Sequence, residues 1–183
     1  MAVDELKKYT AEEFLQMELG SEKQYELIDG VIVSYSAPNE LHQDIVLGLG
    51  SELRSFIRGN GGSCKPFIAP FDVKLDDHTV VQPDVLVVCD QSKLDGKRCN
   101  GAPDIVIEVV SSDKKNDYSI KLEIYKEAGV KEYWIIDPSA ERTVVYIFDN
   151  SRVTDLNIYT FDKPVPVNIF GSALTITIDN LAY

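Results

Sequence analysis

The sequence predicts an α/β (α+β) fold in which a mixed β-sheet is flanked by helices. Helix-start signals and β-type segments alternate along the chain, which is the pattern of a mixed fold. Residues 104–110, DIVIEVV, form a nearly continuous β-branched run, as expected of a strand covered on both faces. A length of 183 residues fits one domain with a real hydrophobic core. We therefore expect a single domain over residues 1–183.

Two short elements are predicted near the N-terminus. Thr10 and Glu13 have the spacing of a capping box and so indicate the start of a short helix, TAEEFLQMEL. Asp29 and Gly30 stand between alternating apolar residues in YELIDGVIV, and an Asp-Gly pair in that setting is a strong signal for a hairpin turn. A helix and then a β-hairpin are therefore expected in this part.

A longer helix and a β-rich region are predicted next. Asn39 can cap a helix from about Glu40 to Arg58, and the glycine-rich segment GNGG at residues 59–62 ends it. From Phe67 to Val88 two β-type segments, FIAPFDVKL and VVQPDVLVV, are separated by a DDH turn. These segments lead to the strand at residues 104–110.

The C-terminal part begins with one more helix. Residues 117–128 have helical periodicity, and Gly129 follows as a stop signal. The segments YWIIDP and TVVYIFD then predict a second hairpin. The tail from Arg152 onward predicts further short strands, including ALTITI. We therefore expect additional β-hairpins at the C-terminus.

The composition is that of an ordinary globular protein, with 44% hydrophobic and 26% charged residues. No apolar run approaches the roughly 18 residues of a membrane span, and the N-terminus, MAVDELKKYT, lacks the pattern of a signal peptide. We therefore expect a cytoplasmic protein with no membrane partner. The net charge of −12 argues against nonspecific coating of nucleic acid, which depends on Lys and Arg. An acidic chain can still act on a polyanion if its acids hold divalent cations.

The three cysteines are Cys64, Cys89 and Cys99. An odd number without a CxxC spacing argues against both a disulfide framework and a zinc site. We expect all three to be reduced and structural.

Lys121 is a charged residue in an apolar setting. Taken at about 100° per residue, it falls on the apolar arc of the helix at residues 117–128, together with Tyr118, Ile120, Leu122, Ile124, Tyr125 and Ala128. A lysine that faces a core loses hydration energy unless an anion meets it. Carboxylates are therefore expected on the elements beneath this helix.

Two acidic residues are candidates for these anions. Glu108 lies near the centre of the strand at residues 104–110, where charge is normally excluded. Asp84 follows Pro83 at the start of DVLVV, where a side chain can project from a sheet edge into a cleft. Each also has a structural interpretation, Asp84 as a turn residue and Glu108 as half of a buried ion pair with Lys121. Because buried pairs stabilise less than apolar replacements do, function is the better explanation for keeping such a pair.

Two carboxylates on adjacent strands with a lysine nearby suit a particular chemistry. The carboxylates form a hard oxygen site for Mg²⁺ or Mn²⁺. Such an ion can lower the pKa of a bound water and stabilise the charge of a pentacovalent phosphate. The lysine can orient or deprotonate that water, or neutralise the transition state. Phosphodiester hydrolysis needs all three functions.

Several segments together resemble a known family. QPDVLVV, PDIVIEVVSS and KLEIYKEAGVKEYWIIDP are similar to the PD-(D/E)XK nuclease superfamily, and specifically to its bacterial putative restriction endonuclease family, Uma2. QYELIDGVIV and His42 fit the same pattern. The resemblance covers about residues 9–140 and leaves a C-terminal β extension at about 141–183. It implies a restriction-endonuclease-like core with a divalent metal in its cleft.

The resemblance also implies roles for individual residues. Asp84 and Glu108 would ligate the metal, with the Val109 backbone carbonyl as a third ligand. The superfamily's simplest form has a lysine two residues after the glutamate, but this position is Val110 here. The basic group is expected instead at Lys121 in the following helix, in agreement with the helical periodicity. Both a catalytic role and the role of a structural counter-ion are open to Lys121.

Two further residues are candidates for supporting roles. Glu26, in the first hairpin, resembles the extra acidic residue that many nucleases of the superfamily contribute from an N-terminal element to bind metal through water. Its alternative is a solvent-facing strand residue. His42 shares a helix face with Val46, Leu49 and Leu53, so it is either a hydrogen-bonded core residue or a ligand.

These observations lead to one leading hypothesis and two alternatives. The leading hypothesis is an endonuclease, dependent on Mg²⁺ or Mn²⁺, that hydrolyses phosphodiester bonds of DNA. Cutting a duplex commonly needs two active sites, so a homodimer is expected, with the second hairpin and the C-terminal strands as its interface. The first alternative is a catalytically inactive nuclease fold kept as a binding or assembly module, with a structural carboxylate-lysine network. The second is a hydrolase of a smaller phosphoester.

Overall fold

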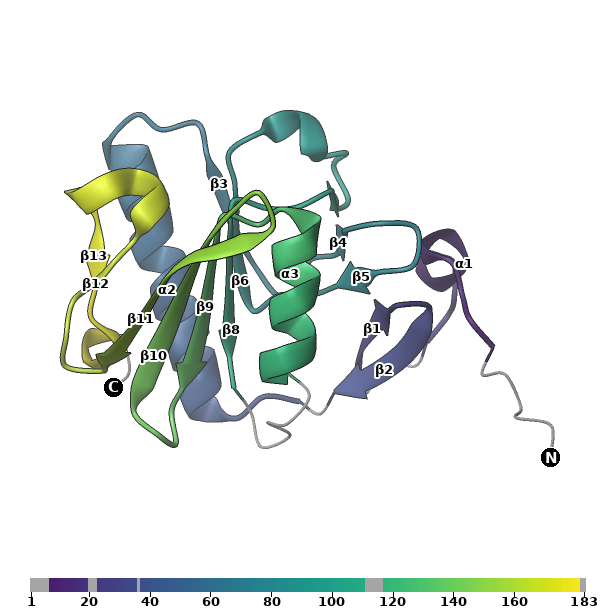
Figure 1. Cartoon of the computed structure of the whole chain (residues 1–183), viewed down its shortest axis with the longest axis horizontal. Coiled ribbons are helices and arrows are strands. Elements are labelled where there is room, and N and C mark those ends of the chain that lie inside the picture. The colour runs from purple at the N-terminus through teal and green to yellow at the C-terminus, as the bar shows by residue number, and fades with distance from the viewer. Residues whose placement is uncertain (1–6, 20–22, 36, 111–116, 182–183) are drawn as a thin grey trace.

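The computed structural model describes residues 7–19, 23–35, 37–110 and 117–181. A six-stranded sheet forms its centre, in the order β11-β10-β9-β8-β6-β3 (Figure 1). Four of its pairs are antiparallel and one, β8 with β9, is parallel, so the predicted mixed sheet is confirmed. The strands of this larger sheet are β3 (Lys65–Ile68), β6 (Val85–Val88), β8 (Ile105–Val109), β9 (Glu132–Asp137), β10 (Arg142–Asp149) and β11 (Arg152–Thr160).

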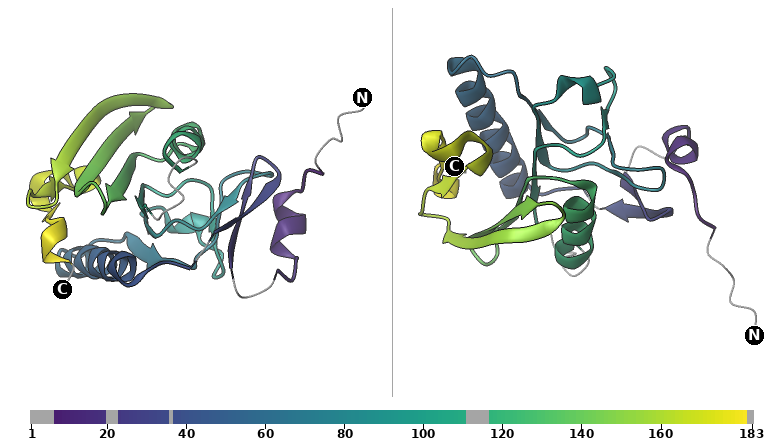
Figure 2. Two further views of the ribbon diagram at one scale, coloured as in Figure 1. Left: turned by 90° about the horizontal axis from the view of Figure 1, so that it is seen from below. Right: turned by 45° about the horizontal axis from the view of Figure 1, so that its top comes forward.

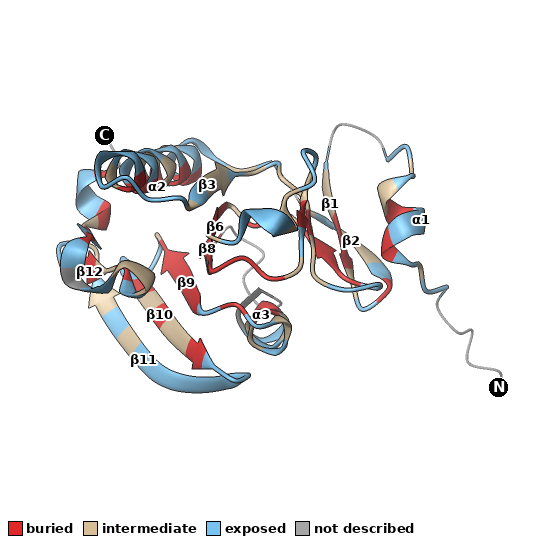
Figure 3. Cartoon of the chain, turned by 90° about the horizontal axis from the view of Figure 1, so that it is seen from above, coloured by how far each residue is buried: buried red, intermediate tan, exposed pale blue. Residues whose placement is uncertain are grey.

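A helix covers each face of the larger sheet (Figure 2). On one face, α2 (Glu40–Gly59) packs Ile45, Leu49 and Leu53 against residues of β6, β8 and β9. On the other face, α3 (Leu122–Ala128) buries Tyr125 against a second core. Every residue of β8 is buried, as expected of a strand covered on both faces (Figure 3). Within the described residues, no helix has the length and apolar character needed to cross a membrane.

A smaller sheet lies beside the larger one, in the order β2-β1-β5-β4-β7. The predicted hairpin is confirmed, with Asp29 and Gly30 at φ values of 47° and 79°, as a tight turn between the two strands requires. The predicted capping box is also confirmed, since Thr10 and Glu13 cap α1 (Ala11–Leu15), which packs on this sheet. The strands are β1 (Gln24–Ile28), β2 (Val31–Tyr35), β4 (Val73–Lys74), β5 (Val80–Val81) and β7 (Cys99–Asn100).

The helix predicted at residues 117–128 begins with a π-helical turn, Asp117–Lys121, before α3. Tyr125 is buried as the periodicity predicts, but Ile120 is 42% exposed, so its predicted place on the apolar face is wrong. The wider turn changes the angle between successive residues, and a wheel drawn at 100° per residue no longer applies there. Gly129 ends the helix at a φ of 91°, as predicted.

The C-terminal part extends the larger sheet and then returns to α2. The predicted hairpin of β9 and β10 is confirmed, and β11 is a nine-residue strand rather than one of several short ones. Two short strands, β12 (Val165–Pro166) and β13 (Thr175–Ile176), pair around the 3₁₀ segment Asn168–Ala173. Buried side chains of this part, including Val165, Val167, Ile176 and Ile178, join the core beneath α2.

Glu132 holds the C-terminal segment against the larger sheet through hydrogen bonds. This residue of β9 is fully buried. Its carboxylate accepts hydrogen bonds from Trp134 Nε1 at 2.7 Å, from the backbone and side-chain nitrogens of Asn168, both at 3.1 Å, and from Ile169 N at 3.0 Å. Four donors thus replace the hydration that burial removes from this carboxylate.

The expectation that all cysteines are reduced is wrong. Cys64 and Cys89 form a disulfide with an S–S distance of 2.08 Å. Lys65 of β3 pairs with Val88 of β6, so the residues one step beyond each strand face one another. The sequence spacing gives no sign of this pairing, because it depends on the register of two strands. Cys99 is free and buried, and burial raises the pKa of its thiol to about 11.

Candidate active site

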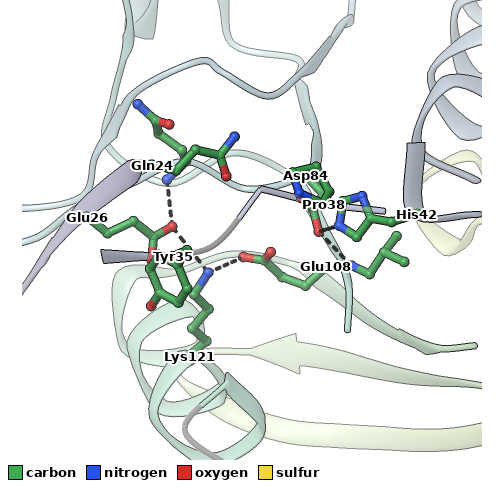
Figure 4. Close-up of a pocket in the computed structure, with 10 residues that line it drawn as sticks. Gln24, Glu26, Tyr35, Pro38, His42, Asp84, Glu108 and Lys121 are labelled. Carbon is green, nitrogen blue, oxygen red and sulfur yellow. Dashed lines mark hydrogen bonds and ion pairs between the residues drawn. The ribbon is translucent and has the colours of Figure 1, made fainter. Parts of the chain in front are cut away.

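The residues proposed from the sequence for a site lie in one pocket with a cavity of about 50 Å³ (Figure 4). The register of the larger sheet places Val85 opposite Ile107, so Asp84 and Glu108 come together at the same end of β6 and β8. The pocket lies between the larger and smaller sheets. Its lining residues are Gln24, Glu26, Tyr35, Pro38, His42, Gln82, Asp84, Glu108, Val109 and Lys121.

Lys121 meets two carboxylates, as its position on the helix requires. Its Nζ lies 2.9 Å from Glu108 Oε1 and 3.2 Å from Glu26 Oε1. It also lies 5.1 Å from the centre of the Tyr35 ring, a cation–π distance. Because Lys121 is only 5% exposed, these contacts replace most of its hydration.

Asp84 is held by the strand next to it and by α2. Its Oδ2 accepts a hydrogen bond of 2.8 Å from the backbone N–H of Val109 and lies 3.1 Å from His42 Nε2. Asn39 caps α2 by accepting from the backbone N–H of His42, and this cap fixes where the imidazole enters the pocket. The second ring nitrogen, His42 Nδ1, is buried and has no hydrogen-bond partner among the described residues.

Glu108 is the acid most changed by its surroundings. Burial raises its pKa to about 8, the Lys121 charge opposes this, and the negative charges of Asp84 and Glu26 add to it. Its Oε1 also accepts a 2.6 Å hydrogen bond from the Tyr125 hydroxyl. The sequence identifies Tyr125 only as a core residue. Its place one turn after Lys121, on the same helix face, is the signal that marks it as a neighbour of the site.

Glu26 is buried, at 2% exposed, so the alternative of a solvent-facing strand residue is wrong. Pairing of β1 with β5 brings it beside Gln82, whose backbone N–H donates a 2.9 Å hydrogen bond to Glu26 Oε1. Its other oxygen, Oε2, is buried without a hydrogen-bond partner among the described residues. The contact of Gln82 with Glu26 was not predictable from the sequence, because a backbone donor carries no residue signature.

The three carboxylates share a simple pattern. Each uses one oxygen to accept two hydrogen bonds: Asp84 Oδ2, Glu108 Oε1 and Glu26 Oε1. The second oxygen of each accepts no hydrogen bond from the described part of the chain. Three acids also outnumber the one lysine that lines the pocket. The pocket therefore has an excess of negative charge and oxygen atoms available to a cation.

Two further features of the site concern its metal-ligating side chains and the position of the superfamily's lysine. In the parts of the chain that the structure describes, no group of three or more His, Cys, Asp or Glu side chains is arranged to hold a metal ion. Val110, at the position where the superfamily's simplest form has its lysine, is buried in the core beneath α3. Alternation along the strand puts this position, two residues after Glu108, on the same face as Glu108, and Val110 supplies no basic group there.

Comparison with known proteins gives a structural match and a family match. A solved structure described as a putative nuclease belonging to DUF820, from Anabaena variabilis ATCC 29413, superposes with a TM-score of 0.76 and 24% sequence identity. The match covers 94% of this chain and 97% of that one, and at this identity it shows the fold. No curated protein matches the sequence. The family model "Putative restriction endonuclease", Uma2, matches residues 11–179, so the chain belongs to this family.

Proposed function

We propose that this chain is a metal-dependent endonuclease that hydrolyses phosphodiester bonds of DNA. Asp84, Glu108 and Lys121 are its catalytic residues, and Glu26 and His42 support them. The observation that carries the proposal is the set of three acids around one lysine, each acid with an oxygen that accepts no hydrogen bond from the described residues. Membership of a family of nuclease-like proteins agrees with it.

Two carboxylates and one backbone carbonyl fit a magnesium or manganese ion, although no cluster of three ligating side chains is present among the described residues. Buried Glu26 Oε2 has no hydrogen-bond partner among the described residues, so the pocket retains an unsatisfied acceptor. Asp84, Glu108 and the Val109 carbonyl would hold the ion, with Glu26 acting through water. This set suits Mg²⁺, which binds through one or two carboxylates and keeps waters and substrate oxygens as its other ligands. When bound, the ion would lower the pKa of a water and stabilise charge on the phosphate.

Lys121 has two tasks in this proposal. Its Nζ donates to Glu108 and Glu26 and so holds both carboxylates at the cavity. It also borders the cavity, where its charge can stabilise a phosphate oxygen that gains negative charge in the transition state. The lysine reaches the site from the helix, because the position two residues after Glu108 is the apolar Val110, which packs in the core beneath α3.

The catalytic assignment is tested by removing each carboxylate. Asp84→Ala and Glu108→Ala should abolish Mg²⁺-dependent cleavage of duplex DNA, followed on a gel, while circular dichroism shows that the fold survives. Glu127→Gln is a matched control, because Glu127 is exposed on α3 and does not line the pocket. Cleavage by either purified alanine variant at the wild-type rate would contradict the assignment.

One observation favours the alternative of an inactive binding or assembly module. Lys121 already bonds two of the three acids, and such a closed network needs no ion. Calorimetric titration with Mn²⁺ separates the two functions. The proposed site should bind Mn²⁺ in the micromolar to millimolar range and lose that binding in Glu108→Gln. A structural network should bind no Mn²⁺ in either protein.

We also propose that two copies associate through β11. This strand is at one end of the larger sheet. Val153, Leu156 and Ile158 are exposed on it, the last at 64%. They stand opposite Phe148, Tyr146 and Val144 of β10, so they extend the apolar face that α3 covers. A partner copy would bury this apolar surface.

A cytoplasmic location is part of the same proposal, because DNA lies in that compartment in cells without a nucleus. Disulfides are rare in the cytoplasm, so the Cys64–Cys89 disulfide is the feature of the structure that stands against this location. Cell fractionation tests the location: recovery of most of the protein outside the cytoplasmic fraction would contradict it.

A further inference from the structure

Each of the two carboxylates proposed as ligands accepts one hydrogen bond from a side chain that the proposed chemistry does not use. For Glu108 this donor is the Tyr125 hydroxyl, and for Asp84 it is His42 Nε2. Each bond goes to an oxygen that already has another donor, Lys121 Nζ in one case and Val109 N in the other. The two donors on each oxygen restrict how the carboxylate can rotate.

Tyr125 is well placed for this task. Its side chain is fully buried on α3, and its hydroxyl lies 2.6 Å from Glu108 Oε1. The ring packs edge-on against Tyr133, with 4.9 Å between their centroids, so the hydroxyl cannot move without disturbing the core. Tyr125 is not among the residues that line the cavity.

His42, on α2, does the same for Asp84 (Figure 4). Its ring is fixed by the capped first turn of α2 and is almost fully buried. The N–H of Val109 already donates to Asp84 Oδ2, and the imidazole adds a second contact to the same atom. Asp84 Oδ1 accepts no hydrogen bond from the described residues and remains available.

We propose that Tyr125 and His42 are positioning residues of the metal site, each fixing one oxygen of a ligand carboxylate so that the other oxygen is kept for the cation. This inference rests on the proposed function. Ligand carboxylates that are held by hydrogen bonds lose less freedom when the ion binds, so their partners contribute to metal affinity. Neither residue needs to touch the reacting atoms.

The test is the affinity for Mn²⁺, measured by calorimetry. Tyr125→Phe removes the donor and keeps the ring, and it should weaken Mn²⁺ binding by about tenfold. For His42, the amide nitrogen of His42→Gln can occupy the place of Nε2, whereas His42→Asn is too short. His42→Gln should therefore bind Mn²⁺ nearly as the wild type does, and His42→Asn should lose about tenfold.

A second readout separates positioning from a role in the chemical step. The Mg²⁺ concentration for half-maximal DNA cleavage should rise in Tyr125→Phe and His42→Asn, while the rate at saturating Mg²⁺ stays close to that of the wild type. Tyr133→Phe is the matched control, because it removes a hydroxyl from the same core and Tyr133 does not line the pocket. It should leave both measurements unchanged.

The outcomes distinguish this inference from the proposed function. If the wild type binds Mn²⁺ and both Tyr125→Phe and His42→Asn bind it equally well, the positioning roles are overturned and the function stands. If the wild type does not bind Mn²⁺, the proposed function fails and this inference fails with it. Melting curves by circular dichroism identify any variant that has lost affinity only because it is unfolded.

Discussion

Lys121 is one positive charge shared by two acids from different sheets. Glu26 belongs to β1 of the smaller sheet and Glu108 to β8 of the larger one. The lysine contacts both and is buried with them. Its energetic role therefore extends to the junction of the two sheets as well as to the proposed reaction.

Replacement of this lysine should destabilise the protein strongly. Lys121→Met keeps the side-chain volume but leaves buried Glu26 and Glu108 without their cation, which should lower the free energy of unfolding by about 3 kcal/mol. Urea denaturation measures the change. The double variant Glu26→Gln with Lys121→Met should recover part of it, because one unpaired charge is removed. A loss below about 1 kcal/mol would show that the ion pairs contribute little.

The raised pKa of Glu108 predicts a pH dependence of stability. Its value is about 8 in the folded protein against 4.5 for an ordinary glutamate. Between these values the folded protein keeps a proton that the unfolded chain has released, so the free energy of unfolding should fall as the pH rises through this window and become level above it. Urea denaturation at a series of pH values measures this. Glu108→Gln cannot titrate there, so the decrease should be smaller by a few kcal/mol in that variant.

Residues whose environment depends on local periodicity were predictable. Burial of Lys121 follows from its neighbours along one helix, and the need for an anion follows from that burial. The hydrogen bond between Tyr125 and Glu108 was not predictable in this way. It depends on how far the helix stands above the sheet, and a sequence pattern contains no such distance.

At the scale of elements, individual strands and helices were predicted more reliably than the pairing of one element with another. The hairpin turn at Asp29 and Gly30 and the cap at Asn39 are local signals, and the structure confirms both. The disulfide between Cys64 and Cys89 depends on the register of β3 with β6, so spacing alone pointed to free thiols. The π-helical turn before α3 likewise broke the regular period at Ile120.

Glu132 shows how one residue can hold an element in place, and this can be tested. Glu132→Gln keeps the shape of the side chain but turns one acceptor oxygen into an NH₂ group that faces N–H donors. We expect a loss of about 2 kcal/mol in the free energy of unfolding, because buried donors are left unsatisfied. Hydrogen exchange should increase most in the segment Asn168–Ala173. Exchange that increases equally across the protein would contradict a local role in fastening this segment.

At the scale of the whole molecule, the mixed fold was predictable from the order of its elements, and the structural match agrees with it. The contacts among the site residues were predicted only in part. Family resemblance pointed to Asp84 and Glu108 as partners, but the meeting of Glu26 with Lys121 requires a second sheet that is built from very short strands. The division of the chain into one domain stays a prediction.

The proposed dimer makes a prediction at this scale. Leu156→Asp places a charge in the apolar surface of β11, so it should convert a dimer into a monomer in light scattering. Asn157→Ser is the matched control, because alternation along the strand places Asn157 on the opposite face. A wild-type protein that is monomeric at tens of micromolar, or a Leu156→Asp variant that stays dimeric, would contradict this interface.

The position of Glu26 in the smaller sheet has a consequence for anyone who would shorten or rearrange this protein. A fragment that begins after β2 would retain Asp84 and Glu108 but lose a carboxylate that contacts Lys121. Lys121 would then contact one carboxylate of the pair, Glu108, and the excess of negative charge in the pocket would be smaller. The N-terminal hairpin is therefore part of the site, and shortened forms of the protein made for activity assays or for fusion to other proteins should keep it intact.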